Sequence, residues 1–323
     1  MLELAAAFLA VIFTTPSMIR LGLKLGVTGI DIHKPWKPVI SKLGGISLIF
    51  GALAGIAIYW IIGGGGLPWI VLVSGVIASL IGLLEDVRGE ISPRVKPLLL
   101  ILASIPILLS GSYVPRPVIP FVGRTRLYRV YPFMIALAYP ITCNAVNSVD
   151  VLNGSMIYTS VPFFIMTLII SYLRGDSTIF TISAIMLAAL IAFIPYNRYP
   201  ARVFPGNSGS LFIGAVMASI AILGRVEFAA IIALLPQIMN EMHILFSIGG
   251  IKSARFIKAR PVEFVKGYLT ASRSRDAPIT LVRMLSAETE VDERRMVYAM
   301  AVLSIFAMIL GLITDLLFIE GMI

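Results

Sequence analysis

Long stretches without charge alternate with short polar segments along the whole chain. Seven stretches of at least 19 residues contain no Lys, Arg, Asp or Glu: 44–84, 97–115, 130–149, 151–173, 177–197, 203–224 and 296–314. A helix of about 20 apolar residues crosses the hydrocarbon core of a bilayer, so each stretch is long enough for a crossing. The first is long enough for two, and the run Gly63-Gly64-Gly65-Gly66-Leu67-Pro68 predicts a tight turn between them.

Two further apolar segments, 4–19 and a bent one at 228–248, bring the predicted number of transmembrane helices to about ten. We therefore expect an all-α polytopic membrane protein, with a single transmembrane domain over 1–323 whose largest loop spans 250–296. Glu3 precedes the first apolar segment and positive charge follows it, which is the reverse of a secretory signal peptide. This segment is expected to be retained as a helix.

The composition agrees with a membrane protein, because 58% of the residues are hydrophobic and 13% charged, against about 25% charged in soluble domains. Of the 26 Lys and Arg residues, 20 fall in the segments that follow the odd-numbered predicted helices: 20–42, 86–96, 144–154, 196–210 and 252–295. The positive-inside rule places those segments in the cytoplasm and both termini outside. The net charge of +9 then reflects topology and anionic lipid headgroups rather than nucleic-acid binding. The single cysteine, Cys143, excludes an intrachain disulfide.

The segment 115–129 departs from the charge rule, because it places four arginines on the predicted external side. Its apolar and polar residues alternate around Gly123, a pattern that predicts a short external β-hairpin. No internal repeat is visible in the sequence, so a repeat architecture is not expected.

Four polar clusters lie at the predicted cytoplasmic ends of the helices. Ionisable groups at membrane depth are costly, so their convergence on one side is the strongest indication of a functional site. The first cluster is Glu85-Asp86, where adjacent carboxylates can share a metal ion or a proton. A helix end that points its acids at water and pairs with Arg88 is an equally good interpretation of this cluster alone.

The second cluster, 144–154, has polar side chains at three-residue spacing. Asn144, Asn147 and Asp150 would line one helical face before Gly154 breaks the turn. Amides suit uracil edges and hard cations, whereas hydrogen bonding between core helices is the alternative interpretation.

The third cluster, 196–210, contains a glycine-rich turn that opens a helix. Such a turn offers free N–H groups and the positive end of the helix dipole, an arrangement that binds phosphate. The fourth cluster consists of Lys252, Arg255, Lys258 and Arg260, which could grip a diphosphate. A solvated or lipid-facing basic surface is the ordinary interpretation of such a run.

Together these segments resemble the polyprenyl-phosphate N-acetylhexosamine-1-phosphate transferases, most closely the eukaryotic and archaeal branch that contains the dolichyl-phosphate GlcNAc-1-phosphate transferase. Glu85-Asp86 with Lys96 stands where that family has Asp-Asp and a following Lys. The stretch 144–154 resembles its Asn-Ala-x-Asn-x-x-x-Gly-x-Asn/Asp-Gly segment, and 199–207 resembles its Tyr-Pro-Ser-Arg-Val-Phe-x-Gly-Asp. Residues 235–240 match its Leu-Pro-Gln-x-x-Asn, so the resemblance runs nearly end to end.

The resemblance implies a ten-helix fold and a Mg²⁺-dependent reaction at the cytoplasmic face, with Mn²⁺ as the alternative ion. A membrane-held polyprenyl phosphate would attack the β-phosphorus of a UDP-N-acetylhexosamine and release UMP. Two anionic substrates must approach each other, so cations are needed to offset their repulsion. The implied catalytic residues are Asp86, Glu85 and Lys96. The implied substrate-binding residues are Asn144, Asn153, Gly154, Gly206, Arg255 and Arg260. The implied metal-facing residues are Asn147, Asn207 and Asp150.

The chain also departs from the family pattern. Asn207 stands where the family has an Asp that binds Mg²⁺, and Asp150 supplies an acid that could replace the missing charge. A catalytically weak homologue that binds lipid phosphate or nucleotide sugar is therefore a second hypothesis. A membrane transporter is the third, although no inverted repeat of broken helices is visible and the polar groups crowd one membrane face.

The resemblance also bears on which sugar is transferred and in which membrane the protein lies. The two histidines, His33 and His243, do not form the loop cluster of the peptidoglycan branch, so GlcNAc is favoured over MurNAc-pentapeptide. The short loops favour an archaeal cell membrane, with the endoplasmic reticulum membrane as the alternative. The expected partners are the nucleotide sugar, the polyprenyl or dolichyl phosphate and the bilayer. Nucleic acid is not expected as a partner, and a homodimer is left open.

Overall fold

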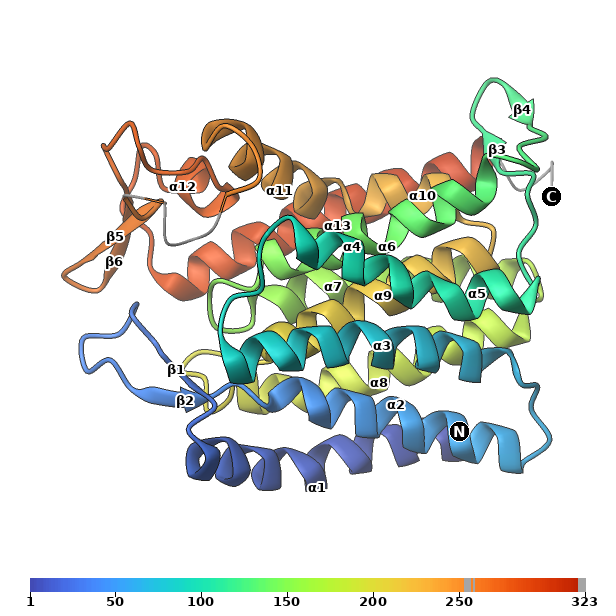
Figure 1. Ribbon diagram of the computed structural model, residues 1–323, viewed down its shortest axis with the longest axis horizontal. Helices are drawn as coiled ribbons and strands as arrows, with labels where there is room; N and C mark the ends of the chain where they lie inside the picture. Colours follow the sequence, from blue (N-terminus) through green and yellow to red (C-terminus); the bar gives the residue numbers. More distant parts are fainter. Residues whose placement is uncertain (253–256, 258, 319–323) are drawn as a thin grey trace.

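The computed structural model describes residues 1–252, 257 and 259–318. Long helices run side by side and are joined by short connections at both ends of the bundle (Figure 1). The helices of 18 or more residues are α1 (Leu2–Leu25), α2 (Gly44–Ile61), α3 (Leu67–Arg88), α6 (Tyr131–Ser148), α7 (Ser155–Leu173), α8 (Ser177–Asn197), α9 (Gly206–Leu223) and α13 (Glu293–Phe318). The shorter ones are α4 (Val95–Leu100), α5 (Ile105–Ser110), α10 (Glu227–Ala233), α11 (Leu235–Ser247) and α12 (Leu281–Leu285). A 3-10 segment, Ile101–Ser104, joins α4 to α5.

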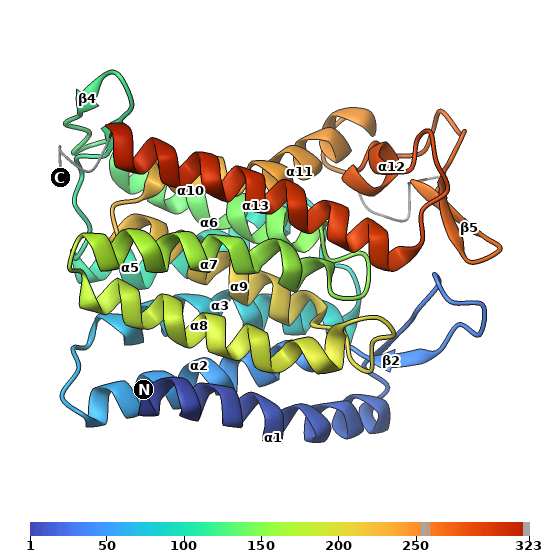
Figure 2. The same ribbon diagram turned by 180° about the vertical axis from the view of Figure 1, so that it is seen from behind.

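Three antiparallel strand pairs lie at the ends of the helix bundle. They are β1 (Thr28–Ile30) with β2 (Val39–Ser41), β3 (Val118–Ile119) with β4 (Gly123–Arg124), and β5 (Val262–Val265) with β6 (Tyr268–Ala271). The hairpin predicted around Gly123 is thus confirmed as β3–β4, whereas the other two were not predicted. The pairs β1–β2 and β5–β6 lie at one end of the bundle, and β3–β4 lies at the opposite end (Figures 1 and 2). We call the first end the polar end.

The helices identify an integral membrane protein. Within the described part of the chain, seven helices are long and apolar enough to cross a bilayer, namely α1, α2, α3, α7, α8, α9 and α13. The pair α10 and α11, bent by 65°, makes an eighth if it counts as one span. The helical stretch Val95–Ser110 is shorter, and α6 is not apolar enough because amides and prolines interrupt it. The expected ten helices are therefore not confirmed by length and composition.

Several predicted boundaries need correction. The first helix does not end near residue 19 but continues to Leu25, where Gly26 closes it in the left-handed conformation at φ 72°. The glycine turn is confirmed, because α2 ends at Ile61 and α3 begins at Leu67. Helix α6 ends at Ser148, so Asp150 lies in the connection to α7 and does not share a helical face with the preceding amides.

Helix α9 forms the centre of the bundle, and its residues from Ser208 to Leu223 are all buried. It packs against α2, α3 and α6, and glycines permit the close approach that packing of helices in membranes requires. A Cβ added at Gly82 of α3 would lie 2.3 Å from the Asn207 carbonyl oxygen, and one at Gly75 would lie 2.7 Å from the Phe212 ring. This contact brings the end of α3 against the beginning of α9 at the polar end.

Candidate active site

A cavity of about 520 Å³ opens at the polar end and collects most of the predicted site residues. Its walls come from the end of α3, the α6–α7 connection, the beginning of α9, the β1–β2 loop, residues 260–262, and parts of α11, α12 and α13. The predicted residues that line it are Asp86, Asn147, Asp150, Asn153, Gly206, Asn207 and Arg260. We call it the central cavity.

Asp86 docks on the N-terminus of α9. Its Oδ1 accepts a hydrogen bond from the backbone N–H of Asn207 at 3.1 Å, and its Oδ2 accepts one from Ser208 at 3.0 Å. These N–H groups have no partner within the helix, and the helix dipole favours a negative charge beside them. Gly206 makes the approach possible, because its φ is +68° and an added Cβ would lie 2.7 Å from the Asp86 Oδ2. The phosphate-binding turn predicted from the sequence thus holds a carboxylate of the protein itself.

The other metal-facing candidates differ in how they are held. Asn147 accepts a hydrogen bond from the Ser210 hydroxyl at 2.7 Å through its Oδ1. The side chains of Asp150 and Asn207 make no hydrogen bond or ion pair with any other described residue. Burial raises the pKa of Asp150 to about 7, and the nearby Asp86 carboxylate raises it further. Two oxygen-bearing side chains therefore face the cavity without a partner in the described part of the chain.

The remaining predicted residues line an adjoining groove of about 500 Å³. Lys96 forms a salt bridge with Glu85, with 2.7 Å between Nζ and Oε2, and both side chains are nearly buried. Asn144 donates from Nδ2 to the Pro140 carbonyl within its own helix at 2.9 Å. The groove and the central cavity share Asn147, and the other groove walls are mainly apolar side chains of α6 and α11. The structure therefore separates Glu85, Lys96 and Asn144 from the central cavity.

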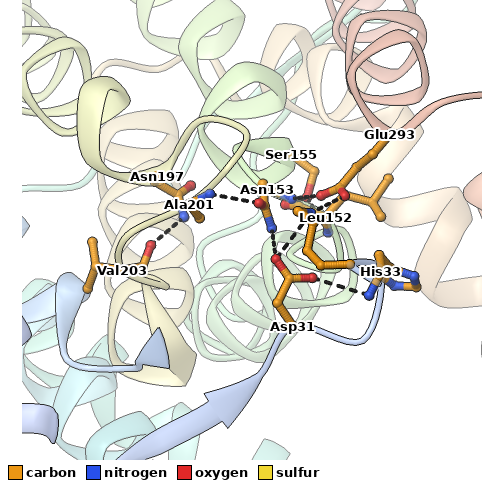
Figure 3. Close-up of polar contacts among 10 residues, drawn as sticks. Asp31, His33, Leu152, Asn153, Ser155, Asn197, Ala201, Val203 and Glu293 are labelled. Atoms are coloured by element: carbon orange, nitrogen blue, oxygen red, sulfur yellow. Dashed lines mark hydrogen bonds and ion pairs between the residues drawn. The ribbon is translucent and has the colours of Figure 1, made fainter. Parts of the chain in front are cut away.

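A buried charged network adjoins the central cavity, and Figure 3 shows three of its residues, Asp31, Asn153 and Glu293. Lys34 forms ion pairs with Asp31, at 3.1 Å, and with Glu293, and its side chain is 1% exposed. Asn153 donates from Nδ2 to Asp31 at 3.0 Å, accepts from the Ala201 N–H at 2.8 Å, and donates its own backbone N–H to Glu293 at 2.8 Å. The network joins the β1–β2 loop, the α6–α7 connection, the connection that precedes α9 and the beginning of α13. We call it the charged network.

The ion pairs of the charged network and several cavity residues were missed in the sequence, although Asn153 of that network was predicted. Lys42 lines the central cavity close to Asp86, and His33 also lines it. Burial lowers the pKa of His33 to about 4, so the imidazole is neutral near pH 7. The signal was the run of ionisable residues at 31–34, but nothing local indicates that Lys34 meets Glu293, 259 positions away.

Three predicted residues lie away from the central cavity or outside the described residues. Gly154 caps the beginning of α7 with a φ of +88°, an added Cβ there would lie 2.9 Å from the Tyr158 ring, and Gly154 does not line the central cavity. Arg255 and Lys258 lie outside the described residues. Arg260 lines the central cavity, and Lys252 lines the groove.

The cavity offers oxygen donors of the kind that a hard cation prefers. No group of three or more His, Cys, Asp or Glu side chains suited to a metal ion occurs among the residues that the structure covers. Mg²⁺, however, commonly takes one or two carboxylates and completes its shell with substrate phosphates and water. Asp86 and Asp150 supply carboxylates, and Asn147 and Asn207 supply amide oxygens. The residues present fit such an ion.

These residues fall within a segment that matches a known family. Residues 68–225, from the beginning of α3 to just before α10, match the model of glycosyl transferase family 4. The chain belongs to this family. The matched segment contains Asp86, Asn147, Asp150 and Asn207 but excludes Lys34 and Glu293 of the charged network.

Two archaeal proteins and one bacterial protein are similar to this chain over about three quarters of its length. A protein of Sulfolobus acidocaldarius named UDP-N-acetylglucosamine–dolichyl-phosphate N-acetylglucosaminephosphotransferase is 33% identical over 252 residues, which cover 74% of this chain and 76% of the relative. A protein of Saccharolobus solfataricus with the same name is 34% identical over 249 residues, with the same two shares. The undecaprenyl-phosphate N-acetylglucosaminyl 1-phosphate transferase of Bacillus subtilis is 27% identical over 246 residues, which cover 74% of this chain and 68% of the relative.

Proposed function

We propose that this chain transfers GlcNAc-1-phosphate from UDP-GlcNAc to a polyprenyl phosphate of the dolichyl type. An oxygen of the acceptor phosphate forms a bond to the β-phosphorus of the nucleotide sugar. The bond between that phosphorus and the oxygen bridging to the α-phosphorus breaks, and UMP leaves. The products are polyprenyl-diphospho-GlcNAc and UMP, so the reaction starts the assembly of a lipid-linked glycan. The family and the names of the relatives support this choice.

The observation that carries the proposal is a polar cavity joined to an apolar groove at one end of a membrane bundle. The central cavity offers carboxylates, amides and cations, which a nucleotide diphosphate requires. The groove offers apolar walls with Glu85 and Lys96, which a phosphate on an isoprenoid tail requires. Asn147 lines both, so the two substrates would meet beside it.

The cations near the reacting phosphates would offset the repulsion between the two substrates. Lys42 and Arg260 line the central cavity, and Lys96 lines the groove. Asp86 would hold the N-terminus of α9 and, through it, orient Asn207 toward the cavity. Its free lone pairs would position the acceptor phosphate or accept its proton.

A magnesium ion would be held by Asp86, Asp150, Asn147 and Asn207, with Mn²⁺ as the alternative. When bound, the ion would neutralise charge on the diphosphate and make the β-phosphorus more electrophilic. Asp150, which has no partner among the described residues, would supply the charge that Asn207 lacks relative to the family's Asp.

The membrane arrangement forms part of the proposal. The stretch Val95–Ser110 and α6 would each cross the bilayer beside the seven apolar helices and the bent pair, which gives ten crossings. The polar end would face the cytoplasm, because most of the basic residues lie there and nucleotide sugars are cytoplasmic. The archaeal relatives favour an archaeal cell membrane.

The test is UMP release by purified protein supplied with UDP-GlcNAc and a polyprenyl phosphate, with and without Mg²⁺. Metal-dependent UMP release that requires both substrates supports the proposal. Release of UMP without the acceptor would identify a hydrolase instead, and no release under any condition would leave the transferase proposal untenable for this chain.

A second candidate is a catalytically weak homologue that binds the same ligands, and Asn207 favours it. Removing a full negative charge from a cation site lowers its affinity for the metal. UDP-GlcNAc binding measured by calorimetry, together with no UMP release even at high Mg²⁺, would select this candidate over the enzyme.

A further inference from the structure

A second cavity at the polar end lies outside the proposed catalytic machinery. It has a volume of about 570 Å³ and none of Asp86, Asn147, Asp150 or Asn207 lines it. Its walls come from the beginning of α7, the end of α8 with the connection that follows, and the first turns of α13. The polar residues that line it besides Asn153 are Arg198, Arg202, Arg294, Tyr158, Tyr199 and Tyr298. We call it the arginine cavity.

The arginine cavity carries positive charge without a matching acid. No Asp or Glu lines it, and none of its three arginines forms an ion pair within the described residues. The Arg294 guanidinium lies 4.8 Å from the centre of the Tyr199 ring, and Arg202 lies 5.2 Å from that of Tyr196. Stacking on a ring orients a guanidinium but leaves most of its N–H donors free. Guanidinium donors and tyrosine hydroxyls converging on one space suit a phosphate group.

The helices beneath the arginine cavity present an apolar surface. On α13, Tyr298, Val302 and Phe306 follow one another at four-residue spacing and are 57%, 63% and 60% exposed. On α7, Val161 and Ile165 continue from the cavity on a half-buried face. Helix α7 lies between α8 and α13, and all three are seen together in Figure 2. All three are apolar enough to span a bilayer, so this surface faces hydrocarbon.

We propose that the arginine cavity binds the phosphate headgroup of an anionic membrane lipid whose apolar chains lie along the exposed face of α13 and the half-buried face of α7. A free phosphate would use only the cavity, whereas a lipid also uses the apolar surface that begins at its edge. Arginine and tyrosine at a helix end match the chemistry of the headgroup region, where an amphipathic side chain keeps its polar tip. The site is separate from the groove beside Lys96, so the lipid bound here is neither substrate of the proposed transferase.

The test compares two double variants that each remove two positive charges from the polar end. R198Q/R294Q removes guanidinium groups that line the arginine cavity. R88Q/R295Q removes exposed ones at the end of α3 and the beginning of α13 that do not line it. Native mass spectrometry of each detergent-purified protein would be titrated with phosphatidylglycerol, with phosphatidylcholine and with inorganic phosphate. Both variants must elute as the wild type does in gel filtration, and R198K/R294K keeps the charge if the glutamines disturb the fold.

We expect wild type and R88Q/R295Q to retain phosphatidylglycerol in preference to phosphatidylcholine, and R198Q/R294Q to bind it roughly tenfold more weakly. The lysine pair should recover part of the affinity. Equal phosphatidylglycerol affinity in the two double variants would overturn the proposal, and so would equal binding of the two lipids by the wild type. Displacement of phosphatidylglycerol by inorganic phosphate at matching concentration would assign the cavity to a soluble phosphate and contradict the lipid assignment.

Discussion

The central cavity and the charged network lie side by side at the polar end, and both are built from carboxylates and amides. They differ in how many of those groups have hydrogen-bond or ion-pair partners. In the charged network, Lys34 is shared between Asp31 and Glu293, and Asn153 uses both ends of its amide. In the central cavity, the side chains of Asp150 and Asn207 have no partner among the described residues.

Partnered and unpartnered polar groups have different uses. A buried charge whose hydrogen bonds are all made holds segments together, and removing its partner costs stability. A polar group that faces a cavity without a partner costs stability itself, and it is retained because something else binds there. Substitutions in the charged network should therefore lower the free energy of unfolding, and those in the central cavity should lower activity.

The largest effect is expected from Lys34→Met. The change leaves Asp31 and Glu293 as two buried acids without a cation, which should cost about 3–5 kcal/mol of folding stability. Thermal unfolding of the detergent-solubilised protein measures it. Lys37→Met is the matched control, because Lys37 is exposed three positions away in the same loop. Equal melting temperatures for the two variants would remove the distinction between the regions.

Asp86→Asn is expected to lower both activity and folding stability, because Asp86 faces the central cavity and also caps α9. The amide lacks the charge that the proposed reaction uses, so UMP release should fall by about 10²–10³-fold, equivalent to about 2.7–4 kcal/mol. One N–H of α9 would also lose its acceptor. Arg88→Gln, at the end of the same helix, should leave UMP release unchanged. Full activity in the Asp86 variant would show that this carboxylate serves only the fold.

Asp150→Asn is expected to change the metal dependence of the reaction without lowering folding stability, which distinguishes the central cavity from the charged network. Because the carboxylate has no partner among the described residues and burial raises its pKa, its neutral isostere should leave the free energy of unfolding unchanged or raise it. The Mg²⁺ concentration for half-maximal UMP release should rise roughly tenfold, since one of the proposed metal charges is lost. A large loss of thermal stability with unchanged metal dependence would place Asp150 with the charged network instead.

The smallest effect is expected from Asn207→Asp, which restores the acid of the family pattern. The added charge should lower the half-saturating Mg²⁺ concentration by roughly fivefold, with thermal unfolding close to that of the wild type. Binding of Mn²⁺ followed by electron paramagnetic resonance gives the same comparison without turnover. Weaker ion binding in this variant would mean that Asn207 does not face the metal.

The long apolar runs predicted most of the fold because hydrophobic length is a local property. They located α2, α3, α7, α8, α9 and α13 and the glycine turn between α2 and α3. The run 130–149 also located α6, and the bent segment predicted at 228–248 is confirmed as α10 and α11, which meet at 65°. The amides of Asn144 and Asn147 lower the apolar character of α6, so its length and composition alone do not identify it as a membrane span. The pairs β1–β2 and β5–β6, whose strands are three or four residues long, were not predicted.

The sequence also identified seven of the residues that line the central cavity, because motifs at helix ends on one side converge when the helices pack. The roles predicted for those residues stay predictions. The helical face expected for Asp150 was wrong, since a helix end cannot be located to within two residues from a polar run. The charged network could not be predicted, because a lysine in a loop usually faces water and only the folded bundle brings Lys34 to Glu293.

The docking of Asp86 on α9 has a consequence for biosynthesis. The two partners are 121 positions apart, so α3 reaches the membrane well before the helix that satisfies its carboxylate. Until α9 has been synthesised and packed, Asp86 lies at the end of α3 without its two backbone N–H donors. The α3 surface at Gly75 and Gly82 also lacks the helix that packs against it. We expect nascent chains arrested before residue 206 to be more open to protease at this end than chains arrested after residue 223, which limited digestion of the two would compare.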